Sequence, residues 1–106
     1  MTNIYRAMSD PVRRKILSKL AKAERTQSEI VREFDISQPA ITKHLRILKE
    51  EGLISEAHCG RYRIYGLDQS AFESAYQEMV QEIDTMLGRT LDDLKHYVEN
   101  KGEEDD

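Results

Sequence analysis

The sequence predicts a mainly α-helical fold with one small β-hairpin, and three observations support this fold class. Apolar residues recur every three or four positions through residues 2–52 and again after residue 68, as they do along a buried helix face. Between these regions, residues 53–67 place β-branched and aromatic residues at every second position, which is typical of strands. A glycine in the segment Cys59-Gly60-Arg61 suits the tight loop of a hairpin.

Composition indicates one domain and excludes several classes of protein. The 106 residues are 34% charged and 7% aromatic, so the core is thin and dimerisation would enlarge it. No apolar run approaches the roughly 20 residues that span a bilayer, and no signal-peptide pattern opens the chain. A single cysteine, Cys59, excludes an internal disulfide. We therefore expect a cytoplasmic protein without membrane insertion.

Charge is distributed unevenly along the chain. Residues 1–67 hold 13 Lys+Arg and 8 Asp+Glu, a net charge of +5, whereas residues 68–106 hold 3 and 12, a net charge of −9. Positive charge supplies most of the non-specific affinity for DNA, because binding releases counterions from the phosphates. The first part of the chain can therefore meet phosphate, whereas the last part repels it.

Two helices are predicted before the first connector. The first covers residues 2–9, and its apolar face is formed by Ile4, Tyr5 and Met8. Asp10 is a good N-cap and Pro11 suits the first helical position, so a second helix is predicted over residues 11–23. The residues of this helix expected to face inward are Val12, Ile16, Leu17 and Leu20. Those expected to face outward are Arg13, Arg14, Lys15, Lys19 and Lys22.

A third helix, over residues 27–34, begins with a capping box. Thr26 is the N-cap, and Glu29 stands three residues later, where its carboxylate can reach back to the backbone. The inward residues are Ile30, Val31 and Phe34. Glu24-Arg25 is interpreted as the connector before this helix, and Asp35-Ile36 as the turn after it. With the helix that follows, this arrangement predicts a helix-turn-helix unit.

The helix after that turn is the predicted recognition helix. Ser37 is its N-cap, Pro39 lies in its first turn, and Gly52 is the C′ residue that ends it. Its buried face is formed by Ile41, Leu45 and Leu48. Its outward face carries Gln38, Pro39, Thr42, Lys43 and Arg46. These polar and cationic groups suit a major groove, where base edges present donors and acceptors; a face that is merely solvated is the alternative interpretation.

The hairpin that follows is interpreted as a wing, which completes a winged helix-turn-helix fold. Arg61 and Arg63 are its basic residues, and His58 lies nearby in the sequence. At the tip, these side chains can reach a minor groove or its phosphates.

The last helix begins after its N-cap, Asp68, and carries a long apolar stripe. The stripe includes Phe72, Tyr76, Met79, Ile83 and Met86. Because one thin domain cannot bury so long a stripe, we interpret the helix as packing against its symmetry mate and the first helix. The predicted dimer contacts are therefore Ile4, Tyr5, Met8, Phe72, Tyr76, Met79, Ile83 and Met86.

Gly88 leaves the course of the last helix open. The helix either continues through it, at a cost of about 1 kcal/mol relative to alanine, or breaks and restarts at Thr90. In both cases residues 1–100 are expected to form a single winged helix-turn-helix domain with N- and C-terminal dimerisation helices. Residues 101–106 are expected to form a disordered acidic tail.

Three segments of the sequence carry a family resemblance. They read SDPVRRKIL, ISQPAITKHLRILKEEGLI and GRYRIYGL. In combination, over about residues 3–85, they resemble the ArsR/SmtB family of bacterial winged-helix repressors. The resemblance implies a cytoplasmic homodimer that binds double-stranded DNA at an inverted-repeat operator, often at its own promoter. It also implies release from DNA when an effector binds.

The same resemblance assigns roles to individual residues. The base-reading positions fall on Ser37, Gln38, Thr42 and Lys43. The family's wing positions fall on Arg61 and Arg63. Beside this resemblance, our own interpretation is that Arg46, Arg61 and Arg63 chiefly hold phosphates. His44 matches a recurrent family histidine, and its place at the margin of the apolar face favours a half-buried structural or phosphate-bonding role.

The metal sites of the family are incompletely represented in this sequence. The segment FDISQPAIT has no cysteine. His96 and Glu99 form the distal H-x-x-E pattern of another site, but its upstream ligand positions are occupied by Ile83 and Thr85. Since a tetrahedral site shared by two protomers needs four ligands, we predict no metal and no cofactor. His96 is instead expected to pair with Asp92 or Asp93.

The remaining functional alternatives concern the inducing signal and the class of protein. The sequence resembles the autorepressors that carry no metal site, some of which are released by a regulatory protein partner. Cys59, beside His58, is interpreted as an incidental thiol, with a redox-sensitive thiol as the alternative. A winged-helix protein–protein interaction module that does not bind DNA is the alternative function. No nucleophile–base pair or glycine-rich phosphate loop indicates an enzyme.

Overall fold

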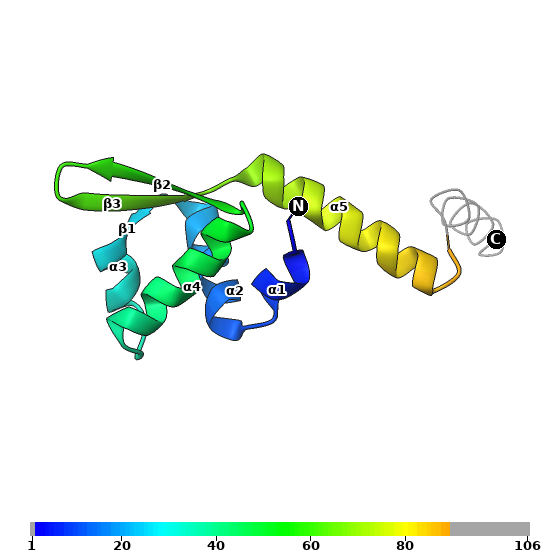
Figure 1. Cartoon of the computed structure of the whole chain (residues 1–106), viewed down its shortest axis with the longest axis horizontal. Coiled ribbons are helices and arrows are strands. Elements are labelled where there is room, and N and C mark those ends of the chain that lie inside the picture. The colour runs from blue at the N-terminus through cyan, green and yellow to red at the C-terminus, as the bar shows by residue number, and fades with distance from the viewer. Residues whose placement is uncertain (1, 90–106) are drawn as a thin grey trace, which may run out of the picture. The chain divides into compact units, whose positions relative to one another are not determined.

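The computed structural model describes residues 2–89 and has the mainly helical fold that the sequence predicts (Figure 1). Its elements, in chain order, are α1 (Ile4–Met8), α2 (Pro11–Lys22), β1 (Arg25–Thr26), α3 (Gln27–Arg32), α4 (Gln38–Glu50), β2 (Ile54–Cys59), β3 (Tyr62–Leu67) and α5 (Gln69–Met86). A first compact unit ends at Ala75, inside α5, and a second begins at Tyr76. The predicted domain end at residue 100 and the acidic tail lie outside the described residues.

The core of the first unit joins the helix-turn-helix to the sheet. The predicted inner face of α4 is buried, since Ile41, Leu45 and Leu48 are each at most 1% exposed. The other buried apolar side chains of α2, α3 and the sheet are Ile16, Leu17, Leu20, Ile30, Leu53, Ile54 and Tyr65. Burial of this apolar area at about 25 cal/mol per Å² is the main force that holds α4 in place.

The predicted helix caps are present in the first unit. Asp10 accepts a hydrogen bond from the Val12 amide at 2.8 Å. Thr26 and Glu29 form the reciprocal capping box, with the Glu29 amide donating to Thr26 and the Thr26 amide donating to Glu29. At the start of α4, Ser37 Oγ accepts from the Ala40 amide at 3.2 Å. Each cap satisfies a backbone donor that the first turn of a helix leaves unpaired.

The wing is a hairpin to which a third strand has been added. Cys59 pairs with Tyr62 across the turn, so the loop has two residues, and its Gly60 adopts a positive φ of 61°. The strand β1 pairs antiparallel with β3, which gives the sheet order β1-β3-β2. The interpretation of Glu24-Arg25 as a plain connector was therefore wrong for Arg25. A strand of two residues is too short to produce a periodic pattern, and its partner is distant in sequence.

The last helix ends before Gly88, which decides between the two alternatives for its course. Its N-cap, Asp68, accepts from the Ala71 amide at 3.0 Å. At the other end, Gly88 has a φ of 72°, its amide donates to the Thr85 carbonyl, and the Arg89 amide donates to the Asp84 carbonyl. These two bonds satisfy carbonyls at the helix end. The predicted restart at Thr90 lies outside the described residues.

Much of the apolar stripe on α5 is exposed within one protomer. The exposed fractions are 48% for Tyr76, 39% for Ile83 and 71% for Met86. Over residues 2–89, no helix combines the length and the hydropathy that crossing a membrane requires.

Candidate nucleic-acid interface

The outward face of α4 presents polar and cationic side chains to solvent. Gln38, Lys43 and Arg46 are exposed, as is the N-cap Ser37. Arg46 has one long i,i+4 contact with Glu50, at 3.9 Å, which is a weak interaction at the surface. The four side chains are thus accessible to a ligand. The predicted roles in base reading and phosphate binding require this accessibility.

Thr42 differs from its neighbours on this face. It is half-buried, and its hydroxyl donates to the Gln38 carbonyl at 2.9 Å and accepts from Gln27 Nε2 at 3.1 Å. Both hydrogen-bonding functions of the hydroxyl are therefore used within the protein. The bond from Gln27 also ties α3 to the recognition helix.

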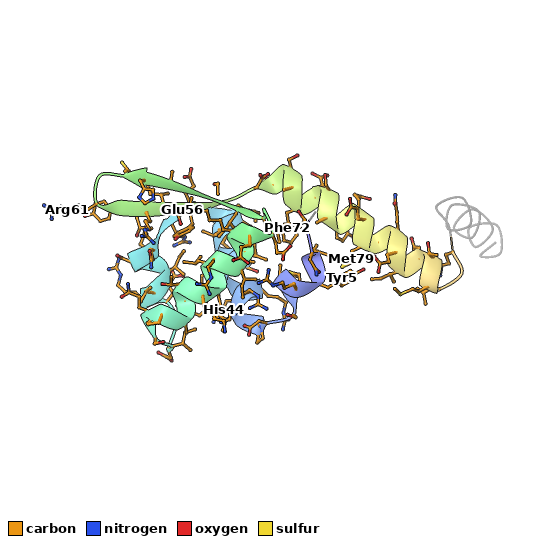
Figure 2. All side chains as sticks on the ribbon, in the orientation of Figure 1. Tyr5, His44, Glu56, Arg61, Phe72 and Met79 are labelled. Carbon is orange, nitrogen blue, oxygen red and sulfur yellow. The ribbon has the colours of Figure 1, made fainter. Side chains whose placement is uncertain are left out.

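The tip of the wing carries exposed cations. Arg61 lies in the loop, at the end of the hairpin in Figure 2, and Arg63 follows on β3. Tyr62 between them is 58% exposed. Cys59 is a free, exposed thiol, and His58 Nε2 lies 3.4 Å from Glu56 Oε1.

Two residues fix the base of the wing. Tyr65 is buried and its hydroxyl donates to Glu56 Oε2 at 2.8 Å. Burial and this hydrogen bond to a carboxylate raise the pKa of Tyr65 to about 12. The same bond, with help from Lys49 at 3.4 Å, lowers the pKa of Glu56. The wing is therefore connected to the end of α4 by charged hydrogen bonds as well as by apolar packing.

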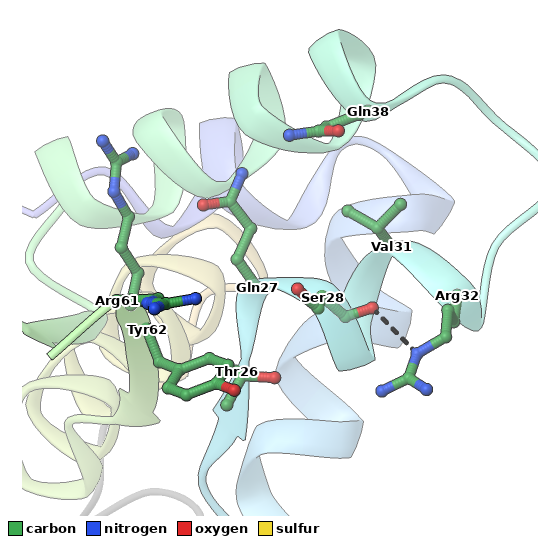
Figure 3. A pocket seen from close by; sticks show the side chains of 9 residues that line it. Thr26, Gln27, Ser28, Val31, Arg32, Gln38, Arg61 and Tyr62 are labelled. Atoms are coloured by element: carbon green, nitrogen blue, oxygen red, sulfur yellow. Dashed lines mark hydrogen bonds between the residues drawn. The ribbon is translucent and has the colours of Figure 1, made fainter. Parts of the chain in front are cut away.

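A pocket of about 340 Å³ lies between the wing, α3 and the start of α4 (Figure 3). Its lining includes Arg32, Arg61 and Arg63 but no carboxylate. The Gln27 side chain lies between Gln38 and the wing residues Arg61 and Tyr62 in Figure 3. Sequence analysis did not assign Arg32 a role. The signal was weak, because it consists of one exposed cation on a six-residue helix.

Behind α4, Arg13 is buried, so the expectation that it faces outward was wrong. Its guanidinium donates to the Ala7 carbonyl at 3.2 Å, to the Arg6 carbonyl at 2.9 Å and to Ser9 Oγ at 3.0 Å. The physical reason is that α1 ends at Met8, which leaves its last carbonyls without helical partners. Arg13 supplies donors to those carbonyls.

His44 completes this network from the recognition helix. Its side chain is half-buried, as predicted, and its Nδ1 lies 3.0 Å from Arg13 Nη1. Because a guanidinium can only donate, Nδ1 must be the acceptor, and the ring proton of the neutral histidine is on Nε2. That atom lies 4.0 Å from Asp10 Oδ1. His44 thus joins α4 to the α1–α2 corner (Figure 2).

The C-terminal end of α4 is joined to α1 by a second network. Glu51 is buried and accepts from Arg6 Nη1 at 2.8 Å and from the Asn3 amide at 2.7 Å. These two hydrogen bonds lower the pKa of Glu51, with the bond from Arg6 as the larger cause. Glu50 also contacts Arg6, at 3.2 Å. The recognition helix is therefore held at its middle and at its end.

The predicted dimer contacts differ in their accessibility. Ile4 is buried inside the protomer, which places it in the core and not on a surface open to a partner. Tyr5 is 45% exposed. The half-buried members are Met8, Phe72 and Met79, and the exposed members are Tyr76, Ile83 and Met86.

The residues of the incomplete H-x-x-E pattern lie in the part of the chain that is not described. Among residues 2–89, no group of three or more His, Cys, Asp or Glu residues could hold a metal ion. His96 and Glu99 lie beyond this range, as do Asp92 and Asp93.

Comparison with known protein families and sequences gives a consistent result. The family described as "Bacterial regulatory protein, arsR family" matches residues 10–56, which contain α2, α3 and α4. The chain is 37% identical over 83 residues to the transcriptional repressor SdpR of Bacillus subtilis, covering 78% of this chain and 92% of SdpR. It is 26% identical over 100 residues to the transcriptional regulator Rv2034 of Mycobacterium tuberculosis, covering 94% and 90%.

Solved structures extend the similarity to the fold. A crystal structure of an ArsR family transcriptional regulator matches with a TM-score of 0.70 at 28% identity, covering 81% of this chain and 94% of that one. An ArsR-like transcriptional regulator from Rhodococcus sp. RHA1 matches with a TM-score of 0.66 at 27% identity, covering 80% and 83%.

Proposed function

The chain belongs to the arsR family of bacterial regulatory proteins, and on this premise we propose that it is a homodimeric repressor that binds an inverted-repeat operator. Members of this family are DNA-binding transcriptional regulators and not enzymes. The relative SdpR is named a transcriptional repressor, which supports repression as the direction of control. We further propose that the protein acts in the cytoplasm and that one of its targets is its own promoter.

The observation that carries the proposal is the contrast between the two faces of α4. The inner face is buried and hydrogen-bonded, whereas the outer face exposes Gln38, Lys43 and Arg46. We propose that Gln38 and Lys43 read base edges with Ser37, and that Arg46, Arg61 and Arg63 hold phosphates. Because the hydroxyl of Thr42 is engaged, we propose that Thr42 contributes its methyl group, which suits the methyl group of thymine.

Exposed apolar side chains on α5 support a dimer. Tyr76, Ile83 and Met86 recur at helical spacing and remain open to solvent in one protomer. Burying them against a second copy would remove apolar area from water. In such a dimer, two recognition helices would enter major grooves about 34 Å apart, one turn of DNA. An effector, such as a regulatory protein partner, would release the DNA.

Footprinting and sedimentation test this proposal together. The purified protein is incubated with the duplex that lies upstream of its own coding region, and protection from nuclease is mapped. We expect protection of an imperfect inverted repeat and a dimer in solution. A monomer at working concentration, with no preferred site of protection, would contradict the proposal and favour a protein–protein interaction module.

Two substitutions test the division of roles on the interface. Gln38→Ala is expected to relax base preference at one position of each half-site, by about 1–3 kcal/mol of discrimination. Arg63→Ala is expected to weaken binding to all duplexes alike. Affinities for the operator and for single-base variants of it measure both effects. If Arg63→Ala altered base preference while Gln38→Ala left it unchanged, the roles would have to be exchanged.

A further inference from the structure

The residues that line the pocket between the wing, α3 and the start of α4 suit the binding of an anion with several oxygen atoms, such as phosphate. Three arginines contribute to its lining, together with the amide side chains of Gln27 and Gln38 and the hydroxyl of Ser28. All of these groups can donate hydrogen bonds to oxygen. A cavity of about 340 Å³ has room for a phosphate group and the sugars on either side of it.

The carboxylates closest in sequence to the pocket are engaged elsewhere. Glu29 is held by the capping box, and Glu33 pairs with Lys19 at 2.8 Å and with Arg25 at 3.4 Å. Within residues 2–89, Arg32, Arg61 and Arg63 form no ion pair with any carboxylate. Glu29 attracts Arg32, and Glu56 attracts Arg63, over longer distances, so the positive charge of the pocket is only partly offset. Because no ion pair occupies the three guanidinium groups, an anion in the pocket could still pair with them.

The cations lie on both sides of the pocket. In Figure 3, Arg61 and Tyr62 are on the wing side, and Arg32 leaves α3 on the opposite side. The Arg32 guanidinium makes one long hydrogen bond, from Nε to the Ser28 carbonyl at 3.4 Å, which directs the side chain along the surface of α3. The other nitrogens of this guanidinium are free to donate.

We propose that this pocket binds a backbone phosphate of the duplex, with Arg32 of α3 as a phosphate ligand that acts together with the arginines of the wing. This inference rests on the proposed function, because the pocket adjoins Gln38 at the start of the reading face. A phosphodiester that lies between the groove read by α4 and the groove reached by the wing would pass this point. The pocket then fixes the register of the protein on DNA and carries no base preference.

Salt dependence of DNA binding tests the role of Arg32. Each phosphate contact contributes about 0.9 to the slope of log affinity against log salt, so a dimer that loses one contact in each protomer should lose about 1.8. At 0.1 M salt the same loss corresponds to an affinity about 60-fold lower. We expect this result for Arg32→Ala with the operator and with a scrambled duplex. Arg32→Lys, which keeps the charge, should retain most of the slope.

Matched controls separate this inference from the proposed function. Arg89→Ala removes the same side chain from an exposed position that does not line the pocket, and we expect the wild-type slope. If wild-type protein did not prefer the operator but Arg32→Ala still lowered the slope on both duplexes, the proposed operator binding would be contradicted and the phosphate pocket would stand. If wild-type protein preferred the operator and Arg32→Ala kept its affinity and slope, the pocket assignment alone would be overturned.

A second measurement distinguishes DNA phosphate from a free anion. Inorganic pyrophosphate is added to the protein without DNA, and the thermal unfolding midpoint is recorded. We expect no shift of the unfolding midpoint at millimolar pyrophosphate. In the proposed complex the pocket holds a single backbone phosphate, and that phosphate binds tightly only because the rest of the duplex is bound as well. A stabilisation that Arg32→Ala abolished, combined with an unchanged salt slope, would assign the pocket to a soluble phosphate compound and overturn the DNA assignment.

Discussion

The two sides of the recognition helix use charged residues in opposite ways. On the inner side, which we call the anchoring contacts, Arg13 meets His44 and Arg6 meets Glu51. On the outer side, which we call the reading surface, the cations of α4 and the wing have few partners in the protein. Charged residues that look alike in the sequence therefore do two different things. Some hold α4 in place, and others remain available to a ligand.

This contrast has a physical basis in the cost of burial. A buried donor or acceptor without a partner costs about 1–3 kcal/mol, so the anchoring contacts must be complete for α4 to be held. An exposed cation costs little when it is unpaired, because water solvates it. The reading surface can therefore keep its donors free for DNA without loss of stability. Substitutions on the two sides should consequently separate folding from binding.

Arg13→Ala should produce the largest loss of stability. It leaves the Ala7 carbonyl and His44 Nδ1 without the donor that Arg13 supplies, whereas the Arg6 carbonyl keeps its hydrogen bond from Ser9 Oγ. We expect a loss of about 3 kcal/mol. Urea unfolding followed by circular dichroism measures it. Lys22→Ala, which removes an exposed cation from the same helix, should change stability by no more than about 0.5 kcal/mol. Equal effects of the two substitutions would show that Arg13 is not an anchor.

Arg13 also illustrates what sequence analysis can and cannot predict. Helical periodicity correctly identified the buried face of α4, and local cap chemistry identified Ser37 and the pair Thr26 and Glu29. These features depend on residues a few positions apart. The burial of Arg13 depends on where α1 ends and on His44, which is 31 residues away. Charge alone suggested that it would be solvated.

The same limit explains the two other features that sequence analysis missed. The strand β1 exists because Arg25 and Thr26 pair with Tyr65 and Ile64, and no local pattern specifies such a pairing. The pocket that contains Arg32 arises where three elements meet, so its lining cannot be derived from one helix. Long-range assembly of short elements creates both features, whereas the reading surface of α4 is a property of one helix.

Glu51→Gln tests the second anchoring contact, and its effect should depend on pH. At pH 7 we expect a loss of about 1 kcal/mol, because the amide is a weaker acceptor for Arg6 than the carboxylate. The folded protein lowers the pKa of Glu51 below its ordinary value of 4.5. The stability that the carboxylate supplies is therefore complete above pH 4.5 and is lost as the pH falls through the lowered pKa.

Unfolding of the wild type and of Glu51→Gln between pH 7 and pH 3 checks this dependence. The difference in unfolding free energy should narrow toward the acid end of the series. Glu50→Gln is the matched control, since the Glu50 side chain is 51% exposed, and it should alter stability by less than about 0.5 kcal/mol. A gap between the wild type and Glu51→Gln that stayed constant across the series would argue against the hydrogen-bonded carboxylate.

Tyr65→Phe should have a similar or smaller effect at the base of the wing. It removes the hydroxyl that donates to Glu56, and we expect a loss of about 1 kcal/mol at neutral pH. Because the folded protein raises the pKa of Tyr65 from 10.0 to about 12, this contribution is complete below pH 10 and is lost as the pH rises toward 12. Unfolding at pH 8 and at pH 11.5 measures it. Tyr62→Phe, at an exposed position, should leave both values unchanged.

The smallest effect on stability is expected for substitutions of Ser37, where the anchoring and reading roles meet in one residue. Ser37 Oγ caps α4, and Asn or Asp can make the same hydrogen bond to the Ala40 amide. Ser37→Asn and Ser37→Asp should therefore both stay within about 0.5 kcal/mol of the wild type in urea unfolding. Only Ser37→Asp places a carboxylate against DNA, so its affinity for any duplex should fall about tenfold or more relative to Ser37→Asn. Asn and Asp have nearly the same shape, so loss of the cap would lower the DNA affinity of both variants. A negative charge at the reading surface would lower the affinity of Ser37→Asp alone. Equal affinities would mean that Ser37 lies away from the duplex, and the start of α4 would have to be removed from the reading surface.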